Sequence, residues 1–486
     1  MGKKADALAW IKKSYEIDPF NYGCMFEEYL LTGNEEPLNR LITLMHGNVY
    51  NFHELALDYN QAYLYQEAEQ VLTIPAVAEE LAKASPLTYY YIGDFLIGQG
   101  KLEEGKAYFE KAELVTPNCC FPNRLEDVNV LTLARNTLSN AARAPYYLGC
   151  LFYDKRQYDL AKENWELSAQ RAPSFPSVWR NLALYYYNNE KNQEKALECM
   201  ERAFNLDPTD SRILMELDQL YKVTGKPHAE RLTFLEQYPT LIAERDDLLL
   251  EQITLLNQLG RYDEAIPLLD GHIFHPWEGG EGKVPAQYQY ARVEKAKQLL
   301  ASGNQIQQAI TLLEECLEYP HHLGEGKLYG AQESDFYYFL GCAYEQQGDM
   351  AKANRCWEQA TLGPTEPAAA MYYNDAKPEK IFYQGLALQK LGRTNEANGR
   401  FYKLVNYGKQ HIFEKQTMDY FAVSLPDLQI WDGDLDLKNR IHCLFMLALG
   451  FIGLGEKEKA NRFFREVEQL DINHQGVMAL RNMIKQ

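Results

Sequence analysis

The chain has 486 residues, of which 46% are hydrophobic, enough for a continuous core and too many for a disordered protein. Its 49 basic and 68 acidic residues give a formal net charge of −19. This charge argues against nucleic acids and anionic membranes as partners, because both attract a basic surface. The sequence shows no signal peptide and no run of 18 apolar residues, so we predict no membrane-spanning helix.

A fixed spacing of small and aromatic residues recurs along the chain. Ala161 lies 12 residues after Gly149, Trp165 four residues further on, and Pro173 eight residues after that. The same spacing, in whole or in part, recurs at Gly93, Gly105, Phe109 and Pro117; at Gly341, Ala353 and Trp357; at Gly385, Ala397 and Phe401; and at Ala448, Ala460 and Phe464. It resembles the signature of the tetratricopeptide repeat, a helix pair of about 34 residues. The resemblance implies an all-α, right-handed superhelical solenoid in which each pair is covered only by its neighbours.

In chain order, residues 1–20 have the spacing of the second half of a repeat, with Ala7, Ile11 and Pro19 in register. A start in mid-repeat predicts a fragment of a longer protein, although a natural chain with a degenerate first cap is an alternative. Weaker units follow at 21–48 and 52–74, and clear units at 86–119, 142–175 and 176–210. Residues 121–141 are expected to form an irregular helix pair or extension. Small residues at the helix crossings should be buried, namely Ala161, Ala196, Ala353, Ala397 and Ala460.

Further units are centred on Ala309, Ala353, Ala397 and Ala460, and the last helix is predicted to cap the open end. We therefore divide the chain into N-terminal repeats at 1–245 and C-terminal repeats at 246–486. Four segments break the period, at 271–286, 320–334, 364–378 and 408–440. We interpret them as loops between repeats or short extra turns, and function tends to lie in the loops of a rigid scaffold.

Two of these loops carry the same four residues, Gly280–Lys283 in HPWEGGEGK and Gly324–Lys327 in HHLGEGK. Corresponding loops of successive repeats lie on one edge of a solenoid, so we expect both loops to face one ligand. Neither is a phosphate-binding P-loop, because the glycine required five residues before the Gly-Lys pair is absent. The alternative is a purely structural role, in which the glycines form turns and the charged side chains keep these turns in contact with water. The candidate binding residues are Trp277, Glu278, Glu281, Lys283, Glu325 and Lys327.

Tyrosines form a second candidate surface, because the chain has 34 of them, many in consecutive pairs or triplets. Consecutive helical positions point about 100° apart, so each cluster can place one ring in the core and another on the concave face. Tyr146 and Arg180 are the candidate contacts there. Most of these rings are nevertheless expected to lie in the core. A clamp of basic residues for a partner's terminal carboxylate is disfavoured.

No pattern of catalytic or metal-binding residues is present in the sequence. It lacks a G-x-S-x-G nucleophile elbow, and the loop histidines His272, His275, His321 and His322 match no metal-binding spacing. We expect no enzyme activity, no cofactor and no metal from this chain. Nine scattered cysteines without a C-x-x-C pair indicate a reduced, cytoplasmic protein.

The second half resembles a more specific family. The strings FHPWEGGEGK, LGEGKLYG, IFYQGLALQKLG, DYFAVSLPDL, NRIHCLFMLALGFIGLG and DINHQG occur in that order. They resemble the C-terminal repeats of large bacterial proteins whose N-terminal β-rich domain is similar in fold to aldose epimerases. The resemblance implies that such a β-rich domain of the parent chain, or a carbohydrate, is a partner.

The predicted function is protein or peptide binding, as an interaction or scaffolding module of a larger bacterial protein. The alternative is an accessory half of a carbohydrate-active enzyme whose catalytic β domain is absent here. A purely structural platform for dimerisation is a third interpretation.

Overall fold

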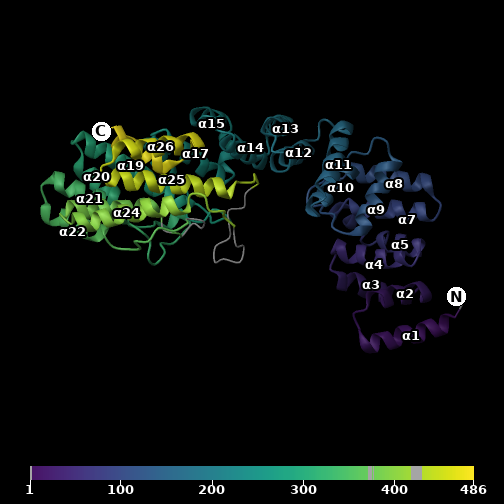
Figure 1. The fold of residues 1–486 in the computed structure, drawn as a ribbon. Helices are drawn as coiled ribbons and strands as arrows, with labels where there is room; N and C mark the ends of the chain where they lie inside the picture. The colour runs from purple at the N-terminus through teal and green to yellow at the C-terminus, as the bar shows by residue number, and fades with distance from the viewer. Residues whose placement is uncertain (1–2, 370–374, 376, 418–429, 486) are drawn as a thin grey trace. The chain divides into compact units, whose positions relative to one another are not determined.

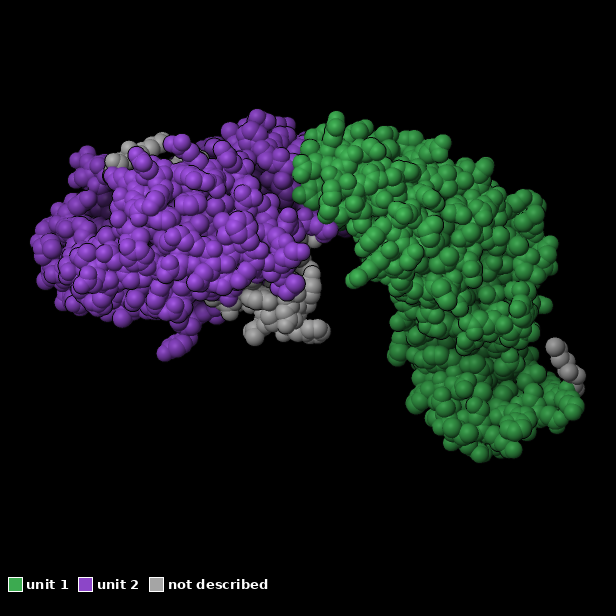
Figure 2. All heavy atoms as spheres, in the orientation of Figure 1, with its two compact units in different colours: residues 1–206 green, residues 207–486 purple. Residues whose placement is uncertain are grey.

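The computed structural model describes residues 3–369, 375, 377–417 and 430–485 (Figure 1). Within them the chain forms helices and no strand, and it divides into two compact units, residues 1–206 and 207–486 (Figure 2). The all-α solenoid expected from the spacing is thus confirmed. The sequence-based division at 245/246 falls inside the second unit, between two helices, and stays a proposal about where the loop-bearing repeats begin.

Unit 1 is a succession of helix pairs. Its helices are α1 (Lys4–Ile17), α2 (Tyr22–Thr32), α3 (Glu35–Met45), α4 (Val49–Gln61), α5 (Tyr65–Leu72), α6 (Ala78–Ala84), α7 (Leu87–Gly98), α8 (Leu102–Leu114), α9 (Leu125–Thr137), α10 (Arg143–Asp154), α11 (Tyr158–Arg171), α12 (Pro176–Asn188) and α13 (Gln193–Leu206). The region expected to be an irregular helix pair or an extension, 121–141, contains the single helix α9.

Unit 2 continues the pattern with longer loops. Its helices are α14 (Ser211–Val223), α15 (His228–Leu235), α16 (Pro239–Ala243), α17 (Asp246–Gln258), α18 (Tyr262–Gly271), α19 (Lys283–Ser302), α20 (Ile306–Glu315), the 3₁₀ turn η1 (His321–Leu323), α21 (Ser334–Gln347), α22 (Met350–Ala360), α23 (Pro378–Lys390), α24 (Thr394–His411), α25 (Leu435–Gly453), α26 (Lys457–Leu470) and α27 (Gln475–Lys485). The string at 419–428 lies outside the described residues, as does the tyrosine pair at 372–373.

The recurring spacing encodes one contact, a glycine of the first helix under an aromatic ring of the second. A Cβ atom added to Gly149 would lie 2.3 Å from the ring of Trp165, and one added to Gly341 would lie 2.2 Å from that of Trp357. The Nε1 group of Trp165 donates a hydrogen bond to the Tyr146 carbonyl at 3.2 Å. The Nε1 group of Trp357 donates the equivalent hydrogen bond to the Tyr338 carbonyl at 3.3 Å. The same joint therefore holds helix pairs together in both units.

Small residues at the helix crossings are fully buried, as the sequence predicted. The five alanines have no exposed surface: Ala161, Ala196, Ala353, Ala397 and Ala460. Only a side chain of this size allows two helix backbones to approach closely, and this fixes the register of each pair.

Substitution of Gly341 by alanine should destabilise unit 2 by about 1–3 kcal/mol, because the new methyl group overlaps the buried ring of Trp357. Gly399 is the matched control. It lies within α24, is exposed, and has no atom within 4 Å of an added Cβ. Gly399→Ala should leave stability unchanged or raise it by up to about 1 kcal/mol, because alanine favours helix. Denaturant unfolding followed by circular dichroism measures both, and equal effects would contradict the assigned joint.

Candidate functional site

The loop between α18 and α19 and the loop between α20 and α21 lie against each other in unit 2. We call residues 275–283 and 321–327 the paired loops. The Phe274 amide, just before the first loop, donates to the His322 carbonyl at 2.8 Å, and the Gly282 amide donates to the Glu325 Oε2 atom at 2.8 Å. Gly324 has a φ of +76°, and a Cβ there would lie 2.5 Å from the Phe274 carbonyl oxygen. The two glycine-rich loops therefore lie in contact, and the expectation that they face one ligand stays a prediction.

The paired loops enclose a pocket of about 310 Å³. Its lining residues are His275, Pro276, Trp277, Glu278, Gly280, Glu281, Val284, Leu323 and Glu325. The Trp277 ring packs directly on Gly280, where an added Cβ would be 2.3 Å away, so the indole is held in place by backbone. The ring remains half-buried and lines the pocket. An aromatic surface on a rigid support can bind a partner at little cost in ordering.

Glu325 contributes a half-buried carboxyl group to the pocket. Burial is the main cause that raises its pKa, the charge of Glu281 adds to the rise, and the hydrogen bond from Gly282 opposes it. The raised pKa means that this acid is held in a partly desolvated place beside a second carboxylate. A hydrogen-bond donor or a cation on a ligand would relieve that cost.

The two lysines of the matching Gly-Glu-Gly-Lys strings do not play equivalent roles. Lys283 is the first residue of α19 and is exposed. Lys327 instead donates to the Leu317 carbonyl at 2.7 Å and forms an ion pair with Glu333 at 2.5 Å. The matching strings therefore do not place their lysines equivalently, because the Lys327 side chain reaches partners outside its own loop.

The other two candidate residues, Tyr146 and Arg180, belong to unit 1. Tyr146 lies on α10, half-buried, with its ring centroid 4.8 Å from that of Phe175. Burial is the main cause that raises its pKa. Arg180 lies on α12 and donates to Asn181 Oδ1 at 3.1 Å. The eight candidate residues thus fall in two places, and their role in binding stays a prediction.

Asp246, the first residue of α17, is a polar partner that the sequence did not reveal. It accepts hydrogen bonds from His272 Nε2 at 2.7 Å and from the backbone amide of His275 at 2.6 Å. Although burial raises its pKa, these hydrogen bonds outweigh burial and lower the pKa overall. His272, just before the first paired loop, and His275, within it, therefore anchor this part of the chain to α17. Within the described ranges, no group of three or more His, Cys, Asp or Glu residues is arranged to hold a metal.

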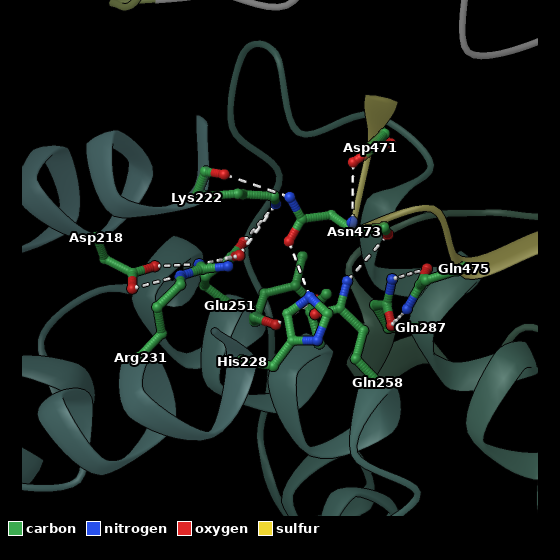
Figure 3. A network of polar contacts seen from close by, with 12 residues as sticks. Asp218, Lys222, His228, Arg231, Glu251, Gln258, Gln287, Asp471, Asn473 and Gln475 are labelled. Carbon is green, nitrogen blue, oxygen red and sulfur yellow. Dashed lines mark hydrogen bonds and ion pairs between the residues drawn. The ribbon is translucent and has the colours of Figure 1, made fainter. Parts of the chain in front are cut away.

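A buried ion network lies elsewhere in unit 2 (Figure 3). Arg231 has no exposed surface and binds both carboxylate oxygens of Asp218, at 3.1 and 2.6 Å. It also donates to Glu251 Oε1 at 2.7 Å, and Lys222 Nζ lies 3.0 Å from the same oxygen. Although burial raises the pKa of Glu251, Lys222 and Arg231 outweigh it and hold the pKa at about 2. The network joins α14, α15 and α17, and the repeat spacing in the sequence does not predict it.

Comparison with known proteins identifies the repeats. The two units are stacks of helix pairs, the class of helical repeat solenoids. The family model described as "Tetratricopeptide repeat" matches residues 87–119, 177–210 and 334–361. The chain therefore contains tetratricopeptide repeats, in unit 1 and in unit 2. Repeats of this kind generally mediate protein–protein interactions.

Curated relatives match over a short stretch. Human RANBP2-like and GRIP domain-containing protein 8 is 33% identical over 75 residues, which cover 15% of this chain and 4% of that protein. Human E3 SUMO-protein ligase RanBP2 is 32% identical over 75 residues, covering 15% of this chain and 2% of the relative. The matched part of this chain thus spans only a few per cent of the length of these relatives.

Three solved structures match parts of the chain at low identity. MamA from Desulfovibrio magneticus RS-1 is 19% identical, covers 41% of this chain and 97% of its own, and has a TM-score of 0.24. The C-terminal part of a TPR repeat-containing protein from Cytophaga hutchinsonii is 15% identical, covers 63% of this chain and 93% of its own, and has a TM-score of 0.25. YrrB, described as a TPR protein with an unusual peptide-binding site, is 16% identical, covers 42% of this chain and 95% of its own, and has a TM-score of 0.19.

None of the helices in the described part combines the length and the hydropathy needed to cross a bilayer.

Proposed function

We propose that this chain is a protein-interaction scaffold and that the paired loops of unit 2 bind a segment of a partner protein. The observation that carries the proposal is the pocket around Trp277, formed by two loops that are hydrogen-bonded to each other. Tryptophan is enriched among the residues that dominate binding energy at protein interfaces. Because backbone and Gly280 hold the ring, little conformational entropy is lost when a partner binds.

Trp277→Ala should weaken the binding of a partner peptide at least tenfold, because the apolar floor of the pocket is lost. Peptides would be selected on the whole chain from a random library, and dissociation constants measured by fluorescence anisotropy. Trp10→Ala is the matched control, since Trp10 is 69% exposed on α1 of unit 1. Equal losses in both variants, or none in either, would contradict a binding role for the paired loops.

We further propose that Glu278, Glu281 and Glu325 favour partners with basic groups at this edge, since three carboxylates line it. Lys283, next in sequence to the lining residue Val284, is proposed to contact acidic groups of the same partner. Tyr146 and Arg180 are proposed as a separate contact surface of unit 1. The nine cysteines are all free, which supports a reducing compartment such as the cytoplasm.

The alternative, an accessory half of a carbohydrate-active enzyme, rests on the sequence resemblance to bacterial proteins with an aldose-epimerase-like domain. The proposals that a β-rich domain is the partner and that the parent protein is bacterial rest on the same sequence resemblance. Addition of oligosaccharides to the chain tests the carbohydrate proposal directly. Changes in Trp277 fluorescence that disappear in Trp277→Ala would favour a sugar over a peptide at this pocket.

A further inference from the structure

The linker segment, which we define as residues 471–475 between α26 and the start of α27, lies against the first helices of its own unit (Figure 3). All four polar groups of Asn473 are matched there. Its Nδ2 group donates to the Lys222 carbonyl at 3.3 Å, and its Oδ1 atom accepts from His228 Nε2 at 3.0 Å. Its backbone carbonyl accepts from Gln258 Nε2 at 3.1 Å, and its amide donates to Asp471 at 2.8 Å.

Gln475 is bound in an equally directional way. Its side-chain amide and that of Gln287 exchange two hydrogen bonds, each of 2.9 Å. Gln287 is itself held by Asn257, whose Nδ2 group lies 3.0 Å from the Gln287 Oε1 atom. Further along α27, Lys297 Nζ donates to the Ala479 carbonyl at 2.6 Å. The segment and the start of α27 therefore contact α14, α15, α17 and α19 in turn.

We call the surface of α14, α15, α17 and α19 that contacts the linker segment the wall. Ion pairs that do not involve the segment link three of its helices. The ion network of Asp218, Arg231, Glu251 and Lys222 ties α14, α15 and α17 together, and the segment supplies none of its charges. A wall that is ordered in advance binds an extended segment with less loss of entropy. The apolar side chains that cap the last repeat, Val477 and Leu480, belong to α27 and are buried in the C-terminal core. The amide contacts of Asn473 and Gln475 are thus additional to capping.

We propose that this wall is a binding site for an extended peptide segment carrying Asn and, two residues later, Gln, and that the chain's own linker segment occupies it as an intramolecular ligand. An external segment of the same chemistry then competes with the linker segment. Tethering gives the internal ligand an effective concentration on the order of millimolar, so the wall is closed to weak competitors. This site is distinct from the paired loops and does not depend on their function.

The test uses the full chain and a fluorescent peptide of residues 470–478. The double variant Asn473→Ala, Gln475→Ala removes the directional contacts of the internal ligand. We expect it to bind the peptide at least tenfold more tightly than the wild type does, because the wall is vacated. A peptide with the same two alanines should not bind. Gln469→Ala, on the exposed surface of α26, is the matched control and should behave as wild type.

Hydrogen exchange on the wild-type chain gives a second measurement that needs no variant to fold. Excess peptide should increase exchange at 471–475, because the external segment displaces the internal one. Circular dichroism establishes that the double variant is folded. A folded double variant that binds the peptide no better than wild type, or binds the alanine peptide equally, overturns the proposal. So does wild-type exchange at 471–475 that saturating peptide leaves unchanged.

Discussion

Arg231→Ala is expected to destabilise unit 2 by about 3–5 kcal/mol, because it leaves a buried carboxylate without its partner. Asp218 is fully buried, and both of its oxygens are bound by Arg231. Glu251 loses one of its two cations in the same variant. Denaturant unfolding of the full chain followed by circular dichroism should show the transition of unit 2 moved to lower denaturant.

Arg261→Ala is the control for this variant. Arg261 forms ion pairs with Glu264 and Glu236, but its side chain is 39% exposed. Exposed ion pairs contribute at most about 1 kcal/mol. A shift for Arg231→Ala no larger than that for Arg261→Ala would show that the buried network does not hold the helices together.

Acidification should remove a second large contribution to the stability of unit 2. The pKa of Glu251 is about 2 in the folded chain against an ordinary value of 4.5. Between these values the unfolded chain binds the proton first, so the stabilisation is complete above pH 4.5 and is lost as the pH falls towards 2. For Glu251 alone its size is on the order of 3 kcal/mol, and Asp218, whose pKa is raised mainly by burial, contributes with the opposite sign. The free energy of unfolding, measured from pH 7 to pH 2, should fall over this window.

The variant Glu251→Gln isolates this contribution from those of other carboxylates. Its free energy of unfolding should differ most from that of wild type near pH 7, and the difference should shrink below pH 4.5. Glu264→Gln, which removes an exposed ion pair, should give a small difference at every pH. A constant difference for Glu251→Gln from pH 7 to pH 2 would contradict the lowered pKa.

The helix pairs and the meeting of the paired loops could be predicted because both follow from local spacing. Gly149 and Trp165 are close in sequence, and a glycine beneath a ring requires no knowledge of distant segments. The loops before α19 and α21 occupy the same place in successive repeats, so the repeat itself brings Gly282 to Glu325. Periodicity thus determines contacts within a repeat and between neighbouring repeats.

Contacts between distant repeats carry no such signal. Asn473 meets Lys222 and Gln258 across more than 200 residues, and no spacing in the sequence relates them. The final helix was expected to cover the open end, but the segment before it also contacts the beginning of its unit. Lys327 shows the same limit at short range, because repeat position does not determine where a long side chain points.

Hydrogen exchange of the whole chain, with and without a peptide selected on it, tests whether the paired loops of unit 2 bind a partner segment. The bound peptide should slow exchange in the paired loops, at 275–283 and 321–327. Protection confined to unit 1, with exchange in both loops unchanged at saturating peptide, would contradict binding at the paired loops.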